Sequence, residues 1–186
     1  GSDVGIKTMF ELCVNPGDEV ISTSPSFPMY EVYCNLYGGS FKSINYEENL
    51  TYSIDKLIEL INDKTSLILI ANPNNPIGDY KTEKELTPLL EITNKLGILV
   101  LIDEAYVEFS PGTLKHLTFK YDNVCISRTF SKAWGGAGVR LGYLMGNTNI
   151  IKGLSKWRLM HEVTGIAAKY GCFLLDNKYE MENYVS

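Results

Sequence analysis

The residues best suited to chemistry lie between positions 123 and 147, in the sequence NVCISRTFSKAWGGAGVRLGYLMGN. An apolar run at 124–126 predicts a buried strand, and hydroxyl groups, glycines, two arginines and one lysine follow it. Hydroxyls, guanidinium groups and the backbone N–H groups of small residues bind phosphate, and a lysine among them is a candidate nucleophile. A flexible, solvated loop has the same composition, so the rest of the chain must distinguish the two.

Lys132 is the candidate nucleophile of this stretch. Phe130 and Trp134 flank it in the sequence, and Arg140 follows on the same stretch. We expect the apolar neighbours to exclude water from the amine and Arg140 to oppose a second positive charge. Both effects favour the neutral, nucleophilic form of the lysine.

Alternating strand and helix patterns have to position these residues. Short apolar or alternating runs predict strands at 19–23, 41–46, 66–71, 98–102, 124–126 and 139–145. Helical spacing and cap residues predict helices from Ser2 or Asp3 to 14, from Ser26 to 37, and at 54–62, 82–96, 149–160 and 164–175. Thr82 and Glu85 make a capping box for the fourth helix, although Pro88 leaves open a start after Thr87.

Strands that alternate with helices predict a doubly wound, mainly parallel sheet with helices on both faces, which is a three-layer α/β/α fold. We expect one domain over residues 1–186. Ligands of such sheets bind beyond the carboxyl ends of the strands. Three successive strands bring Asn75, Asp103 with Tyr106, and Lys132 to that edge, so we expect the site there.

Composition restricts the class of partner. The chain has 186 residues, is 45% hydrophobic and carries a formal net charge of −5, as an ordinary globular domain does. This charge gives no footprint for nucleic acid, and no apolar run approaches the roughly 20 residues of a membrane span. The four cysteines lie in apolar settings without a C-x-x-C pair, so we expect reduced thiols, no metal site and a cytoplasmic location.

Three common site motifs fail on spacing. The acidic strand end at 100–104 resembles that of an ATPase, but no G-x-x-x-x-G-K-[ST] loop accompanies it. The glycines at 136–142 miss G-x-G-x-x-G by one residue and precede a strand, which argues against a dinucleotide site. The G-x-S-x-G motif of a serine hydrolase is absent from the sequence.

The remaining candidates meet the needs of pyridoxal 5'-phosphate (PLP). A lysine is needed to form an imine with its aldehyde, and a carboxylate such as Asp103 is needed to keep its ring nitrogen protonated. Tyr106 and Asn75 can donate to the ring oxygen. The phosphate needs backbone amides, which we expect at the start of the first helix with Ser2 and Asp3. It also needs hydroxyl and cationic groups, which we expect to be Thr129, Ser131 and Arg140.

Three segments also resemble a known family. ANPNNPIG at 71–78, LIDEAYVEF at 101–109 and SRTFSKAWGGAGVRLGY at 127–143 are similar to motifs of the fold-type I PLP-dependent aminotransferases, in particular the histidinol-phosphate aminotransferases and their relatives. They stand in that family's order. The resemblance implies that Lys132 is the Schiff-base lysine and that Asp103 pairs with the ring nitrogen. It also implies that Phe27, in SPSFPMY, stacks on the ring and that the full-length enzyme is a homodimer.

The departures from the family leave the substrate open. Relatives carry a segment before the Gly1-Ser2-Asp3 turn and a C-terminal small domain, so we expect this chain to be a large domain truncated at both ends. RLMHEVTG at 158–165 stands where a histidinol-phosphate enzyme would carry a Pro-Tyr-Asn type of segment. Arg158 and His161 within it are interpreted as structural and are left out of the site.

Three hypotheses follow for the function. The first is transfer of an amino group between an amino acid or amino-phosphate donor and a 2-oxo acid. The second is decarboxylation of a phosphorylated amino acid on the same cofactor. The third is a non-catalytic fragment that binds PLP poorly or serves as a structural dimer unit.

Overall fold

The computed structural model describes residues 1–158 and 162–186, and within them a six-stranded sheet forms the centre of the molecule. The strand order is β2-β1-β3-β4-β5-β6, in which only the β5–β6 pair is antiparallel. The strands are β1 (Glu19–Ser24), β2 (Ser40–Asn45), β3 (Thr65–Ala71), β4 (Leu99–Asp103), β5 (Val124–Thr129) and β6 (Gly142–Gly146). The α-helices are α1 (Ser2–Cys13), α2 (Met29–Leu36), α3 (Ile54–Glu59), α4 (Glu83–Leu96), α5 (Leu117–Lys120), α6 (Thr148–Ser155), α7 (Gly165–Asp176) and α8 (Lys178–Val185). Two 3-10 turns, η1 (Val107–Phe109) and η2 (Ala137–Val139), complete the described elements.

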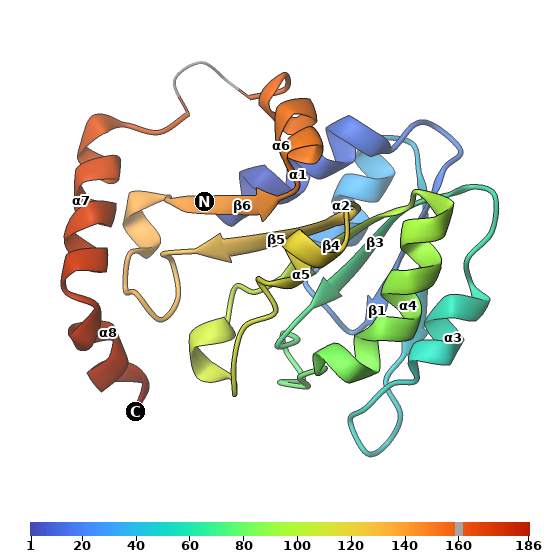
Figure 1. The fold of residues 1–186 in the computed structure, drawn as a ribbon, viewed down its shortest axis with the longest axis horizontal. Helices are drawn as coiled ribbons and strands as arrows, with labels where there is room; N and C mark the ends of the chain where they lie inside the picture. The colour runs from blue at the N-terminus through green and yellow to red at the C-terminus, as the bar shows by residue number, and fades with distance from the viewer. Residues whose placement is uncertain (159–161) are drawn as a thin grey trace.

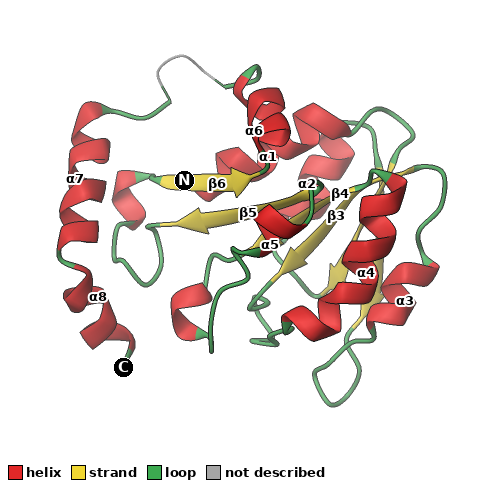
Figure 2. Cartoon of the chain, viewed as in Figure 1, coloured by secondary structure: helices red, strands yellow, loops and turns green. Residues whose placement is uncertain are grey.

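Helices cover both faces of the sheet, as Figures 1 and 2 show. On one face α1, α2 and α6 pack against alternate strand residues, which are Val20, Leu67, Leu69, Leu101 and Cys125. On the other face α3, α4 and α5 pack against the residues between them, among them Ile21, Ile68, Ile70, Val100, Ile102, Val124 and Ile126. Successive side chains of a strand point to opposite faces, so continuous apolar runs are expected where both faces are covered. The predicted three-layer fold is confirmed.

The last two helices lie beside this core. In Figure 1, α7 and α8 stand at the edge of the molecule beyond β6 and the loop before it. Neither helix contributes a side chain to the two apolar clusters, and Ile166 and Tyr184 are 85% and 74% exposed. Both apolar clusters are therefore built by residues 6–154.

Three helix starts differ from the predictions or decide between them. α2 begins at Met29 with Pro28 as its N-cap, so the predicted start at Ser26 is wrong. Gly1 is the N-cap of α1, so the prediction that Ser2 or Asp3 caps this helix is wrong, and both are its first helical residues. The Thr82 capping box is confirmed, and Pro88 lies inside α4. A proline at this position removes one backbone hydrogen bond, whereas the capping box and the buried leucines of α4 stabilise the earlier start.

Other differences concern short or irregular segments. α5 and α8 were not predicted, since α5 has only four residues and α8 follows α7 after a single residue. β6 begins at Gly142 rather than at 139, because η2 and the left-handed Arg140 precede it. The helix predicted at 149–160 ends at Ser155, and His161 lies outside the described residues. Among the described helices, none combines the length and apolar character needed to cross a membrane.

Candidate active site

A cavity of about 190 Å³ lies at the carboxyl edge of the sheet, next to the first turn of α1. It is formed by α1 and by the segments that follow β1, β3, β4 and β5. All ten predicted site residues line it, namely Ser2, Asp3, Phe27, Asn75, Asp103, Tyr106, Thr129, Ser131, Lys132 and Arg140. The structure therefore brings together residues that are far apart in the sequence.

Asp103 ends β4 and is only 5% exposed. Ser127 Oγ donates a hydrogen bond to its Oδ1 at 2.5 Å, and Tyr30 Oη donates one to its Oδ2 at 2.8 Å. Burial raises the pKa of this carboxyl, and the two hydroxyl donors act in the opposite direction. Within residues 1–158 and 162–186, no basic side chain forms an ion pair with Asp103. The cavity thus has a buried acid that a cationic ligand atom would neutralise.

The other side of the cavity is suited to an anion. The first turn of α1 faces it with Ser2 and Asp3, and a helix N-terminus carries partial positive charge. Arg140 Nη1 donates to Ser131 Oγ at 3.3 Å, which places a guanidinium and a hydroxyl side by side. Thr129 contributes a second hydroxyl to the lining. Hydroxyls, a guanidinium and backbone N–H groups together form a phosphate-binding set.

Lys132 lies in the loop after β5, with its Nζ 5.2 Å from the centroid of the Tyr106 ring. The side chain is exposed, so the prediction that neighbouring apolar residues desolvate it is wrong for the described chain. Phe130 is instead 5% exposed and packs against Trp134, with ring centroids 5.5 Å apart. The two aromatic rings fix the loop, and they leave the amine open to the cavity and to solvent.

The loops after β1 and β3 form the remaining walls. Asn74 is buried and its Nδ2 donates to Ser26 Oγ at 3.3 Å, which ties the two loops together. Asn75 is thereby positioned at the cavity. Phe27 packs edge-on against Tyr30, with ring centroids 5.5 Å apart, and presents its side chain to the same space.

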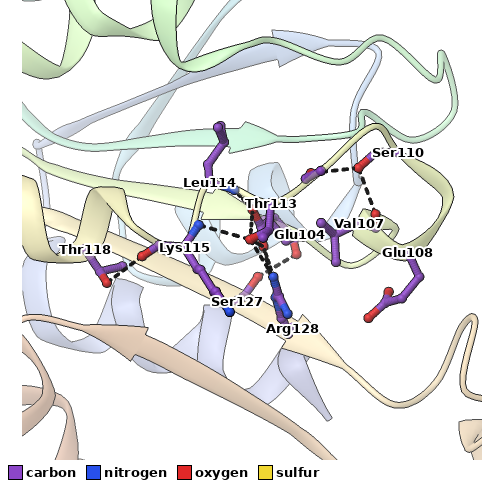
Figure 3. Close-up of polar contacts among 12 residues, drawn as sticks. Glu104, Val107, Glu108, Ser110, Thr113, Leu114, Lys115, Thr118, Ser127 and Arg128 are labelled. Atoms are coloured by element: carbon purple, nitrogen blue, oxygen red, sulfur yellow. Dashed lines mark hydrogen bonds and ion pairs between the residues drawn. The ribbon is translucent and has the colours of Figure 1, made fainter. Parts of the chain in front are cut away.

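Arg128, one of the two arginines of the predicted anion stretch, does not line this cavity. Its Nε and Nη2 donate to Glu104 Oε2 at 2.9 and 2.7 Å, and Thr113 and the Leu114 backbone also donate to this carboxylate, as Figure 3 shows. Glu104 is 1% exposed. This buried ion pair joins the ends of β4 and β5, and so has a structural explanation without a ligand.

Tyr30 and Ser127 are the contacts of the site that sequence reasoning did not assign. Alternation along the strands could have indicated Ser127, because Asp103 shares the face of Leu101 and Ser127 shares the face of Cys125. In the structure, Asp103 and Ser127 are aligned in the β4–β5 register. Tyr30 gave no such signal, since a tyrosine on the buried face of a helix is most simply explained as core.

The residues present fit PLP. The buried Asp103 matches a protonated ring nitrogen, and the anion side matches a phosphate. Lys132 supplies an amine that lines the same cavity. Phe27 offers an aromatic surface, and Tyr106 and Asn75 offer hydrogen-bond donors.

Comparison with known proteins gives a consistent family. The model described as aminotransferase class I and II matches residues 1–183. A histidinol-phosphate aminotransferase of Methanococcoides burtonii is 36% identical over 143 residues, which cover 77% of this chain and 39% of that protein. One from Ruminiclostridium cellulolyticum is 33% identical over 190 residues, covering 100% of this chain and 52% of that protein.

Solved structures agree with the fold. The histidinol-phosphate aminotransferase of Clostridium acetobutylicum superposes with a TM-score of 0.89 at 22% identity and covers 99% of this chain and 55% of that one. The Sinorhizobium meliloti histidinol-phosphate aminotransferase, solved with pyridoxal-5'-phosphate, gives 0.86 at 22% identity and covers 100% and 51%. This chain spans about half the length of the curated relatives that it matches.

Proposed function

This chain belongs to the aminotransferase class I and II family, and we propose that it is the large, PLP-binding domain of a PLP-dependent aminotransferase. The reaction is transfer of an amino group between an amino acid or amino-phosphate donor and a 2-oxo acid. One observation carries the proposal: ten residues from separate segments, each with chemistry that PLP needs, line a single cavity.

Asp103 and its neighbours bind the ring. PLP supplies an aldehyde that reacts with amines and a protonated ring that withdraws electrons. The Asp103 carboxylate keeps the ring nitrogen protonated by offering it a buried negative charge. Tyr106 and Asn75, which line the cavity, would donate hydrogen bonds to the ring oxygen, and Phe27 would cover one face of the ring and exclude water from it.

The anion side of the cavity binds the phosphate. The amides of Ser2 and Asp3, at the start of α1, act together with the hydroxyls of Thr129 and Ser131. Arg140 adds a full positive charge, which its contact with Ser131 holds beside those hydroxyls.

Lys132 carries the chemistry. With PLP in the site, its amine would hold the aldehyde carbon covalently. With an amino donor bound, the same amine would act as general base and general acid and would move a proton at the substrate Cα. Lys132 is exposed and its Nζ lies 5.2 Å from the centroid of the Tyr106 ring, so the amine is accessible from the cavity.

Decarboxylation of a phosphorylated amino acid on the same apparatus is the second candidate. A threonine-phosphate decarboxylase from Porphyromonas gingivalis is among the similar structures, but at 21% identity this likeness concerns the fold alone. The curated relatives described above are named as histidinol-phosphate aminotransferases, so transfer is the proposal. Release of CO₂ from a phosphorylated amino acid, without transfer to a 2-oxo acid, would favour the decarboxylase.

We further propose a homodimer of the full-length protein and a cytoplasmic location. The four cysteines are free in the structure, as reduced thiols of a cytoplasmic protein would be. The homodimer is what the resemblance to fold-type I aminotransferases implies. Sedimentation of the full-length protein and fractionation of cells that produce it would test these two points.

Reductive trapping tests the central proposal. The chain is mixed with PLP, reduced with borohydride and mapped by mass spectrometry, and we expect a pyridoxyl adduct on Lys132. Lys132→Arg should remove the adduct, whereas the exposed Lys115→Arg should keep it. An unmodified Lys132 would contradict catalysis by this chain and favour the non-catalytic fragment. A specific adduct on another lysine would overturn the site assignment.

A further inference from the structure

We propose that Tyr30 and Ser127 are positioning residues that keep Asp103 ionised and fix its orientation, so that its charge is available to a cationic ring nitrogen. This inference deepens the proposed function and rests on it. Neither residue lines the cavity, so both act through Asp103. Three lines of observation carry the inference: the hydrogen bonds, the placement of the three side chains, and the charges around them.

The two hydroxyls bind different oxygens of the carboxylate. Tyr30 donates to Oδ2 at 2.8 Å and Ser127 donates to Oδ1 at 2.5 Å. Tyr30 and Ser127 are both 0% exposed, so no competing solvent reaches these bonds. Burial and the charge of Asp103 raise the pKa of Tyr30 well above its usual value, and the phenol therefore stays a donor. Together the bonds fix the rotation of the carboxylate.

The sheet and α2 place these groups without help from a loop. Ala71, Asp103 and Ser127 are aligned across β3, β4 and β5, on the face that α2 covers. Ala71 has a small side chain, so the row leaves Asp103 open on that side while Ser127 contacts it on the other. Tyr30 reaches the row from α2, where it is the largest fully buried side chain. Rigid elements therefore supply both donors.

The neutral hydroxyl donors matter because the surroundings of Asp103 offer no basic partner among the described residues. Glu104, next to Asp103 in the chain, disfavours ionisation of Asp103 but does not line the cavity. Besides Asp103, the charged residues that line the cavity are Asp3, Lys132 and Arg140. Among the described residues, none of the basic ones forms an ion pair with Asp103. A basic partner would stabilise the carboxylate but would also neutralise it. Hydroxyl donors stabilise the ionised form and leave its net charge for a cation in the cavity.

The first experiment uses the chain without PLP. The ¹³C carboxyl signal of Asp103, assigned by its loss in Asp103→Asn, is titrated in wild type, Tyr30→Phe and Ser127→Ala. Each substitution removes one hydroxyl and preserves the rest of the side chain. We expect the carboxyl to bind its proton about tenfold more tightly in each variant, since hydrogen bonds to charged groups are among the stronger ones. Circular dichroism confirms that both variants are folded.

Tyr37→Phe is the matched control. Tyr37 lies at the end of the same helix and its hydroxyl donates to the Glu11 carboxylate at 2.7 Å, a bond of similar length. The substitution therefore removes the same chemical group and leaves Asp103 untouched. Its Asp103 titration should match that of wild type.

The second experiment measures PLP affinity against pH by fluorescence. In Tyr30→Phe and Ser127→Ala, affinity should fall at a higher pH on acidification than in wild type, because Asp103 is protonated earlier. At alkaline pH, where the carboxyl is ionised in every protein, the affinities should agree within about twofold. A purely structural role would weaken binding equally at every pH, and that result would overturn the inference.

The two experiments also separate this inference from the proposed function. An unchanged Asp103 titration in both variants overturns the positioning role, whether or not PLP binds. A shifted titration in a chain that does not bind PLP at any pH overturns the proposed function and supports the hydroxyl network as a device that ionises Asp103.

Discussion

At the scale of single residues, Asp103 combines a requirement of the site with a disadvantage for folding. The carboxyl is buried at a strand end, where ionisation is unfavourable, and its two hydroxyl donors only partly offset this. Residues selected for binding a charged ligand often lower the stability of the free protein. The loss of folding stability caused by the buried Asp103 carboxylate should therefore be measurable in the absence of PLP.

Asp103→Asn should make the PLP-free chain more stable at neutral pH. Because burial raises the folded-state pKa of Asp103 above its unfolded value, folding loses stability as the pH rises through the folded pKa. Asparagine does not ionise, so the advantage of the variant should shrink as the pH falls toward the usual carboxyl range. Urea unfolding at neutral and acidic pH measures the difference. The exposed Asp63→Asn is the control, and a variant less stable than wild type at neutral pH would contradict the explanation.

Individual site residues were predictable where a short motif carries their chemistry. Asn75, Asp103 and Lys132 each follow a recognisable strand, and the carboxyl edge of a parallel sheet unites them. The surroundings of these residues were less predictable. The exposure of Lys132 and the pairing of Arg128 with Glu104 depend on how loops pack, and neighbours in sequence do not determine that.

At the scale of elements, the antiparallel strand β6 positions the start of α1. Gly142 lies so close to the Ser2 backbone nitrogen and the Arg128 carbonyl oxygen that an added Cβ would clash with both. The same close approach brings Arg140, just before β6, to the first turn of α1. The phosphate side of the cavity is therefore assembled by a contact between a strand and a helix.

Gly142→Ala should displace α1 from the cavity. The methyl group meets backbone atoms, which cannot move aside as a side chain does, so we expect a loss of about 1–3 kcal/mol in the free energy of unfolding. PLP affinity should fall as well. Gly138→Ala is the matched control, because a Cβ there has no heavy atom within 4 Å. Urea unfolding and fluorescence titration measure both effects, and equal behaviour of the two variants would argue against this contact.

Elements with strong local signals were predicted within one to three residues, as for β3, β4 and α4 with its Thr82 cap. The start of β6 was not predicted correctly, because Arg140 adopts a left-handed backbone conformation that the amino-acid sequence does not reveal. Contacts with Ser131 and Ala137 hold Arg140 in place, and these form only in the folded chain.

At the scale of the whole molecule, the sheet core and the C-terminal helices are separate in structure. Both apolar clusters lie within residues 6–154, while α7 and α8 stand beside β6 in Figure 1. Gly171 of α7 lies beside Leu141, and Trp134 lines a cavity together with residues of α7 and α8. The helices thus lie against the segment that carries Lys132.

Deletion of residues 164–186 should leave the core folded but weaken the site. Because neither cluster loses a side chain, the truncated chain should unfold cooperatively with a similar urea midpoint. The loop at 130–141 loses its cover, so Trp134 fluorescence should shift to longer wavelength and PLP affinity should decrease. A truncated chain without a cooperative transition would show that α7 and α8 belong to the core.

The molecule's layered architecture was predictable because strands buried on both faces have continuous apolar runs. The position of α7 and α8 was not predictable, since α7 exposes large apolar residues such as Ile166 and Leu175 to solvent. Periodicity identified α7 as a helix but contained no information about where it lies.

The aligned row of Ala71, Asp103 and Ser127 also limits how this protein can change length. A single residue inserted into β4 before Asp103 would rotate the carboxylate to the opposite face of the sheet, among the leucines of α4, and would separate it from both hydroxyls. Insertions and deletions that preserve the site must therefore fall in the loops. Within these strands, one residue gained or lost inverts the site, and only even-numbered changes return Asp103 to the correct face.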